Sequence, residues 1–167
     1  MALAEALVME LDQESRTTRK LLERVPSDKL GWKPHAKSMS LGELAGHVAS
    51  VPGGISTMAL SDTFDFATHA RPPLPQTKEA IVATHEESVA TAKNVASQLG
   101  DAGLMRDWEA KMNGKPMMKM PKVAVFRNML LNHWIHHRGQ LSVYLRLLDV
   151  PVPSIYGPSA DEGPRGM

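Results

Sequence analysis

The stretch NHWIHHRGQLSVYLRLL, residues 132–148, places three of the chain's seven histidines within five positions of a helical pattern. Apolar residues and two of these histidines recur every three or four positions from about Lys122 to Leu148, which predicts one long α-helix. His133 and His137 lie four residues apart, so they project from one side of that helix with their Cβ atoms about 5–6 Å apart. Both fall on the apolar face, where water cannot easily satisfy their ring nitrogens, so we expect a partner for them inside the protein.

Three further segments outside this stretch carry the helical spacing of apolar residues. The first spans residues 2–25, and the third runs from Thr77 to Gly100. The second begins at a capping box opened by Ser40, and Pro52 predicts a kink or a break and restart in it, because proline lacks an amide hydrogen. Four helices without strong strand periodicity predict an all-α four-helix bundle, with residues 1–167 forming a single domain.

The segments between and after these helices are rich in turn-forming residues. Residues 69–76 form a proline-rich connector, and the pair Asn113-Gly114 suits the tight turn of a short two-stranded hairpin. The tail, residues 149–163, is rich in proline and glycine, so we expect it to lie extended against the bundle or against a partner.

Charge and cysteine content exclude several classes of protein. The 19 basic and 18 acidic residues give a net charge of +1, and there is no basic tract of the kind that binds phosphates, which argues against nucleic-acid and anionic-lipid partners. The chain has no cysteine, so disulfides, thiolate metal ligands and a cysteine nucleophile are excluded. The N-terminal segment matches neither a signal peptide nor a membrane span, so we expect a cytoplasmic protein with no membrane partner.

A metal ion would satisfy His133 and His137, but two histidines make a weak site. Tight binding normally takes three protein ligands, with one position left open for water or substrate. His47 lies beside the inward face of the second predicted helix, His85 falls on the apolar stripe of the third, and the spacing favours His47. The alternative is that each is a core histidine, hydrogen-bonded to backbone carbonyls or to water.

The neighbours of His137 could support such a site or belong to the surface. His136 is offset from His137 by about 100°, so we expect it on the flank of the helix. Arg138 and Gln140 follow directly and could orient ligands or the tail of the chain, although a solvated arginine is the commoner case.

Two stretches of the chain form a specific pattern. They are WKPHAKSMSLGELAGHVA, residues 32–49, and NHWIHHRGQLSVYLRLLDVPVPSIYG, residues 132–157, which contains the core H-x-x-x-H-R-G-Q. Together they resemble the DinB/YfiT-like family of metalloproteins, and with the helices around them the resemblance covers nearly the whole chain. It implies a four-helix bundle of the up-down-down-up type and a homodimer, which a monomer mass from light scattering at micromolar concentration would contradict.

Members of that family place one histidine from the second helix and two from the fourth on a single metal ion. Carried over by motif, the ligands in this chain are His47, His133 and His137, whereas His85 has no counterpart. The implied cofactor is a divalent metal ion, with zinc or nickel ranked ahead of iron. Imidazole suits all of these metals, so the ligands alone do not choose between them.

The resemblance implies less about activity than about fold. Some relatives are metal-dependent thiol transferases or isomerases, and three neutral histidines would leave the charge of the ion free to acidify a bound water toward a pKa of about 7. The sequence therefore predicts a metal-dependent enzyme of the transferase or hydrolase type, thiol-dependent in one version, acting on a small-molecule substrate. The alternative is a stress protein that binds a metal or a small molecule without catalysis, since no acid or base lies beside the histidines by motif.

Overall fold

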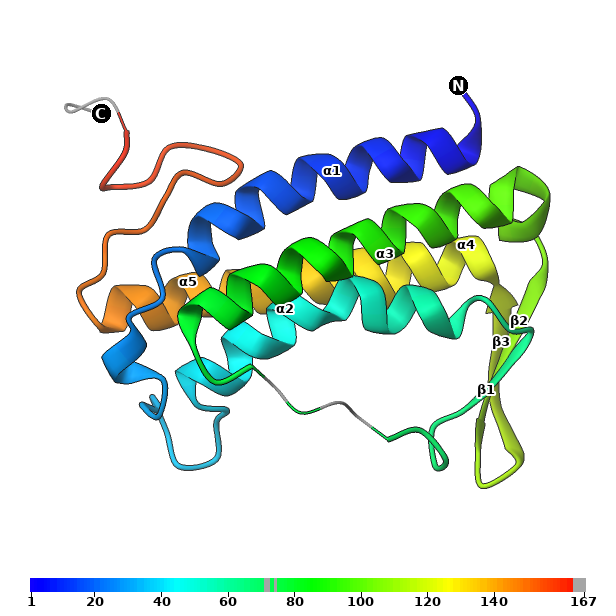
Figure 1. Ribbon diagram of the computed structural model, residues 1–167, viewed down its shortest axis with the longest axis horizontal. Coiled ribbons are helices and arrows are strands. Elements are labelled where there is room, and N and C mark those ends of the chain that lie inside the picture. The colour runs from blue at the N-terminus through cyan, green and yellow to red at the C-terminus, as the bar shows by residue number, and fades with distance from the viewer. Residues whose placement is uncertain (71–72, 74, 164–167) are drawn as a thin grey trace.

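The residues that the computed structural model describes, 1–70, 73 and 75–163, form four long helical segments with a small sheet at one end (Figure 1). The first three helices are α1 (Leu3–Leu22), α2 (Leu41–Met58) and α3 (Lys78–Leu104), with a short 3₁₀ turn, η1 (Ser27–Lys29), after α1. The fourth segment consists of α4 (Lys122–Ala124), the π-helix η2 (Val125–Asn132) and α5 (His133–Leu147). The strands are β1 (Thr63–Asp65), β2 (Asp107–Met112) and β3 (Lys115–Pro121). The predicted helical bundle is confirmed, and the sheet is an addition to it.

One apolar core joins the helices. Its residues recur along each helix every three or four positions, which is the spacing that keeps them on one face. Fully buried examples from the four segments are Leu11, Leu21, Leu44, Val48, Ile81, Ala92, Phe126, Leu130 and Leu141. Burying each large side chain of this kind contributes about 1.5–3 kcal/mol to stability.

Within the described residues, no helix combines the length and the apolar character needed to cross a membrane.

Helix α2 continues through Pro52, so of the two predicted outcomes, a kink or a break and restart, the break and restart is wrong. Proline leaves the carbonyl of Val48, four residues earlier, without its helical donor. The indole Nε1 of Trp134 on α5 donates to that carbonyl at 2.9 Å. The next amide, that of Gly53, donates to Ser88 Oγ of α3 at 2.6 Å, and a Cβ on Gly53 would lie only 3.0 Å from Ser88 Cα. Neighbouring helices therefore replace the bonds that proline disrupts.

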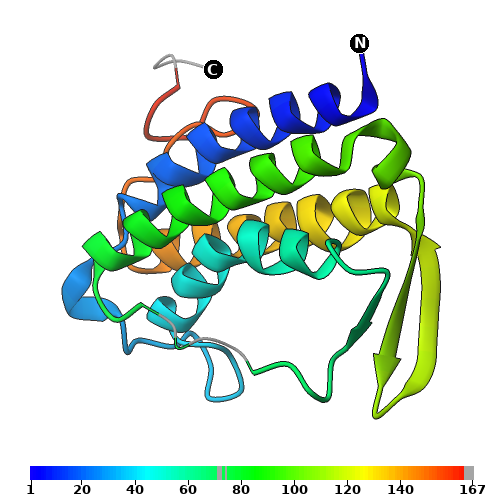
Figure 2. The ribbon, with the colours of Figure 1, turned by 45° about the vertical axis from the view of Figure 1, so that its right-hand side comes forward.

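The sheet lies at one end of the helical bundle, and its strands have the order β1-β2-β3 (Figure 2). Strands β2 and β3 form the predicted hairpin, with Asn113 and Gly114 at φ values of 51° and 76° in its turn. Strand β1 pairs in parallel with β2, and the sequence pattern does not predict this pairing. Asp65 at the end of β1 accepts from the backbone amides of Asn113 and Gly114 at 3.1 and 2.6 Å. The connector predicted at residues 69–76 lies partly outside the described residues.

The predicted end of the third helix at Gly100 is only partly correct. Gly100 has φ 57° and ψ −176°, so the chain leaves the helical conformation there. Glycine tolerates this positive φ because it has no Cβ. One further helical turn follows, and α3 ends at Leu104, which is buried in the core.

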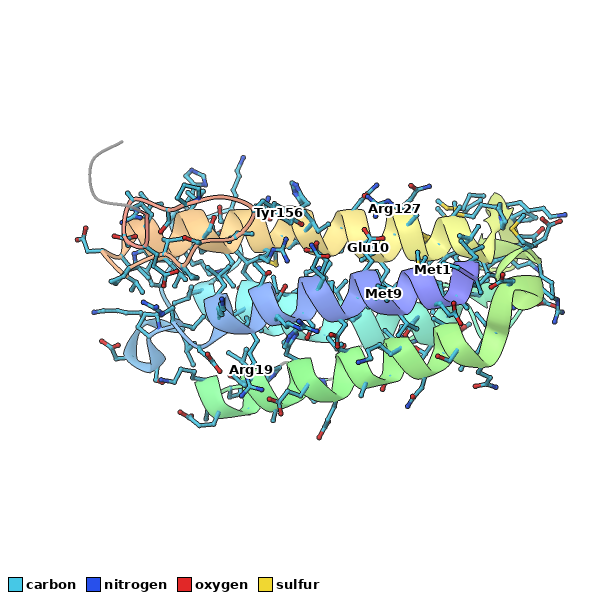
Figure 3. All side chains as sticks on the ribbon, turned by 90° about the horizontal axis from the view of Figure 1, so that it is seen from above. Met1, Met9, Glu10, Arg19, Arg127 and Tyr156 are labelled. Carbon is cyan, nitrogen blue, oxygen red and sulfur yellow. The ribbon has the colours of Figure 1, made fainter. Side chains whose placement is uncertain are left out.

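The tail after α5 lies against α1 and α5 (Figure 3). Of the two positions predicted for it, against the bundle or against a partner, the structure shows the first. The hydroxyl of Tyr156 accepts from Arg138 Nη2 at 2.5 Å and donates to Glu14 Oε2 of α1 at 2.7 Å. Arg138 Nη1 lies 2.6 Å from Glu14 Oε2, and the whole Arg138 residue is 1% exposed. The commoner expectation of a solvated arginine is therefore wrong for Arg138, which joins two helices and the tail.

Candidate metal centre

The structure brings His47 of α2 together with His133 and His137 of α5. The ring centroids lie 5.1 Å apart for His47 and His133, 4.6 Å for His47 and His137, and 4.4 Å for His133 and His137. Each ring offers one nitrogen, and these three nitrogens lie within 4.8 Å of one another. The Nε2 atoms of His47 and His133 are 2.9 Å apart. Three imidazoles from two helices thus face a common point.

A hydrogen bond beside the cluster holds the two helices in register. Trp134 follows His133 directly and is fully buried, and its indole donates to the carbonyl of Val48, the residue after His47. That carbonyl is free to accept because Pro52 lacks an amide hydrogen. The same bond that lets α2 continue through Pro52 therefore sets His47 opposite His133.

The cluster is half-buried at the edge between α2 and α5. The sequence predicted an interior position for it, and the structure corrects this prediction. Burial lowers the pKa of His133, and the nearby charges of His137 and His136 lower it further. Burial also lowers the pKa of His137, helped by His136 and opposed by the hydrogen bond to Gln140. Both rings are therefore neutral at neutral pH, which is the protonation state that metal ligation needs.

The donor set fits a divalent metal ion. Metal–nitrogen bonds of about 2.0–2.1 Å require neighbouring ligand nitrogens to be roughly 2.9–3.4 Å apart, from right-angle to tetrahedral arrangements. The His47–His133 pair is already at 2.9 Å, and the third nitrogen lies within 4.8 Å of both. Three imidazole nitrogens at a half-exposed edge also leave a side open for water or substrate.

His85, the weaker sequence candidate for the third ligand, lies elsewhere in the core. It is 1% exposed, and its Nε2 lies 3.2 Å from both the hydroxyl and the carbonyl oxygen of Ser15 on α1. Its Nδ1 has no hydrogen-bond partner among the described residues. His136 is exposed, with its ring 5.1 Å from that of His137, as expected for a group on the flank of the helix. Neither histidine belongs to the cluster.

His85 should make the fold sensitive to mild acid. Burial lowers its pKa from the ordinary 6.5 to about 4. The unfolded chain therefore binds a proton at His85 between about pH 6.5 and pH 4, while the folded protein resists it, so stability falls as the pH drops through that window. We expect His85 to account for a loss of about 3 kcal/mol in the free energy of unfolding.

Urea unfolding of wild type and His85→Gln between pH 7 and pH 4 measures this contribution. All titratable groups other than His85 are the same in the two proteins, so their contribution cancels in the difference. We expect the curve of the variant to be flatter by about 3 kcal/mol over this range. Parallel curves for the two proteins would show that His85 is not the acid-sensitive group.

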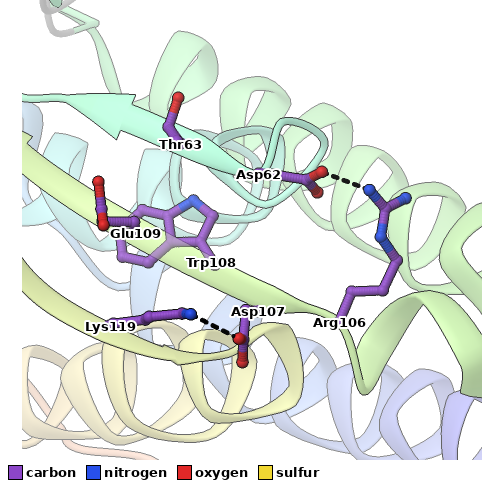
Figure 4. A pocket seen from close by; sticks show the side chains of 7 residues that line it. All are labelled: Asp62, Thr63, Arg106, Asp107, Trp108, Glu109 and Lys119. Carbon is purple, nitrogen blue, oxygen red and sulfur yellow. Dashed lines mark hydrogen bonds and ion pairs between the residues drawn. The ribbon is translucent and has the colours of Figure 1, made fainter.

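A hollow of about 370 Å³ lies beside the sheet and not at the histidines (Figure 4). Its charged groups pair with one another: Asp62 with Arg106, and Asp107 Oδ2 with Lys119 Nζ at 2.8 Å. Asp62 Oδ1 is also 2.9 Å from Nζ of the buried Lys122. The hollow is open, and its charges are neutralised by their neighbours, so the histidine cluster is the better candidate for chemistry.

Comparisons with known proteins agree with the helical fold. The family model described as "DinB family" matches residues 2–166. "Uncharacterized protein YrdA" of Bacillus subtilis (strain 168) is 30% identical over 151 residues, which covers 89% of this chain and 85% of that protein.

Solved structures show the same fold at lower identity. A DinB-like protein from Bacillus cereus ATCC 10987 aligns with a TM-score of 0.71 and 20% identity, covering 91% of this chain and 97% of that one. The DinB-like protein YjoA from Bacillus subtilis aligns with a TM-score of 0.68 and 20% identity, covering 90% and 99%. A third, from Exiguobacterium sibiricum 255-15, aligns with a TM-score of 0.63 and 20% identity, covering 96% and 97%.

Proposed function

The chain belongs to the DinB family, and from that premise we propose that it is a metal-dependent enzyme of the transferase or hydrolase type. Its substrate is a small molecule that reaches the half-exposed edge between α2 and α5. The observation that supports this most directly is the convergence of three imidazole nitrogens, from His47, His133 and His137, within 4.8 Å of one another.

The chemistry follows from the character of the three ligands. When bound, a divalent ion would supply a Lewis acid whose full charge lowers the pKa of a coordinated water or thiol. Burial lowers the pKa of His133 and His137, so both rings are neutral and each has one nitrogen with a free lone pair. A hydroxide or thiolate nucleophile suits either hydrolysis or thiol transfer, so the reaction is proposed at this level. Zinc or nickel is the proposed metal, with iron next, since imidazole binds all three.

One observation favours the alternative, a metal-binding or small-molecule-binding stress protein without catalysis. The cluster consists of histidines alone among the described residues, with no carboxylate beside them. Glu43, one turn before His47, accepts from the backbone amide of Ser40 at 2.6 Å and lies 3.6 Å from Lys33 Nζ. Its carboxylate therefore caps α2 and is not free to act as a general base.

Metal analysis followed by a reaction panel tests the proposal. We expect protein purified without chelators or added metal to contain about one equivalent of a divalent ion. The loaded protein is then assayed with low-molecular-weight thiols and electrophiles such as epoxides, and with esters and amides. Turnover that is lost on metal removal and returns on reloading supports the enzyme. Bound metal without turnover favours the alternative. A metal-free protein with no affinity for zinc, nickel or iron defeats the enzyme and the metal-binding form of the alternative. The homodimer and the cytoplasmic location stay predictions.

A further inference from the structure

Gln140 lies one helical turn beyond His137 and touches its ring. The Oε1 atom of Gln140 is 2.7 Å from Nδ1 of His137. Residues three positions apart on a helix are neighbours, so this contact arises within α5 without help from another element. An amide oxygen can only accept a hydrogen bond, so Nδ1 of His137 carries the proton. The lone pair of the neutral ring is then on Nε2.

We propose that Gln140 is a positioning residue that holds His137 in the Nδ1–H tautomer, with Nε2 presented to the histidine cluster. The proposal deepens the metal centre proposed above and rests on it for its function. A metal-ligating histidine commonly donates its second ring N–H to an acceptor of this kind, and that acceptor fixes both the tautomer and the plane of the ring.

The other two histidines of the cluster are arranged differently. The Nε2 atoms of His47 and His133 face each other at 2.9 Å, so a hydrogen bond between them places a proton on one of these two nitrogens. For both Nε2 atoms to hold one metal ion, that proton would have to be on Nδ1 of its ring instead. His137 needs no such exchange, because Gln140 already keeps the proton on the far side of its ring. Gln140 therefore makes His137 the ligand that is ready before metal binds.

Three variants separate this role from a general effect on the helix. Gln140→Met keeps the length of the side chain and removes the acceptor. Gln140→Glu keeps an acceptor and cannot donate. Gln98→Met makes the same change at an exposed glutamine on α3, and serves as the matched control.

The tautomer is measured on metal-free protein by long-range ¹H–¹⁵N correlation spectra of the histidine rings, assigned by loss of signals in His137→Ala. We expect His137 to be in the Nδ1–H form in wild type, Gln140→Glu and Gln98→Met. We expect Gln140→Met to show a mixture of the two tautomers. An Nε2–H form in wild type, or an unchanged tautomer in Gln140→Met, would overturn the proposal.

Affinity for Zn²⁺, measured by competition with a chromophoric chelator, is the second readout. Loss of a bond of this kind weakens metal binding by about 10–100-fold, and we expect that loss in Gln140→Met but not in Gln140→Glu or Gln98→Met. In a His137→Ala background, Gln140→Met should have no further effect, because its partner is gone. Equal affinities for Gln140→Met and Gln98→Met would contradict the proposal. A wild type that binds no metal would defeat the proposed function, while the tautomer still decides the role of Gln140.

Discussion

Replacing His133 with alanine is expected to weaken Zn²⁺ binding by about 100-fold or more. Zinc sites with four protein ligands bind with about 10–16 kcal/mol, which is about 3 kcal/mol for each ligand. His133 offers the nitrogen that lies 2.9 Å from that of His47, so its loss removes one of three ligands and the partner of another. Isothermal titration or chelator competition on metal-free protein gives the affinity. His47→Ala should show a loss of the same order.

His136→Ala is the matched control for this substitution. It removes an exposed imidazole from the same helix, with its ring 5.1 Å from that of His137, and it takes no part in the cluster. We expect the affinity of this variant to stay close to that of wild type. If His133→Ala and His136→Ala bound Zn²⁺ equally well, the three-histidine centre would have to be abandoned.

The second large effect is on stability, and concerns Arg138. Arg138→Met is expected to lower the free energy of unfolding by about 3–5 kcal/mol, because it leaves the carboxylate of Glu14 buried without its partner. Glu14 is 5% exposed, and Arg138 also donates to the hydroxyl of Thr18 at 3.1 Å. Urea unfolding at pH 7 measures the loss. The double variant Glu14→Gln with Arg138→Met should recover part of it, since the stranded charge is gone.

An exposed ion pair in the same bundle provides the comparison. Arg127 pairs with Glu10 of α1 on the outer face (Figure 3), with side chains 50% and 37% exposed. Exposed pairs are worth about 0–1 kcal/mol, so Arg127→Met should cost no more than that. Similar losses for Arg127→Met and Arg138→Met would show that burial of the Arg138 pair does not control its contribution.

The spacing of residues along the chain is enough to predict the helices and the face of a helix on which a residue lies. The helical periodicity predicts the four helical segments, and the separation of four residues puts His133 and His137 on one side of a helix. The position of His47 beside the inward face of α2 distinguishes it from His85, which the structure places against Ser15. Each of these predictions uses only residues that are close in the sequence.

The features that spacing misses depend on partners far away in the chain. Pro52 alone predicts a kink or a break in α2. The helix does not break, because Trp134 donates to the carbonyl of Val48, and this donor lies 86 positions away in the chain. Arg138 resembles a surface residue until Glu14 and Tyr156 are found beside it. The half-buried position of His47, His133 and His137 likewise depends on how α2 packs against α5, and the residue pattern within either helix does not predict it.

The π-helix η2 has a rotational consequence for the rest of its segment. Val125 and Leu145 are both fully buried. A straight α-helix turns by about 100° per residue, so it would direct these two side chains roughly 160° away from each other. The wider i→i+5 turns of η2 advance by a smaller angle per residue, and this phase correction lets both ends of the segment face the same core. The direction in which His133 and His137 point therefore depends also on η2, which holds none of the three histidines.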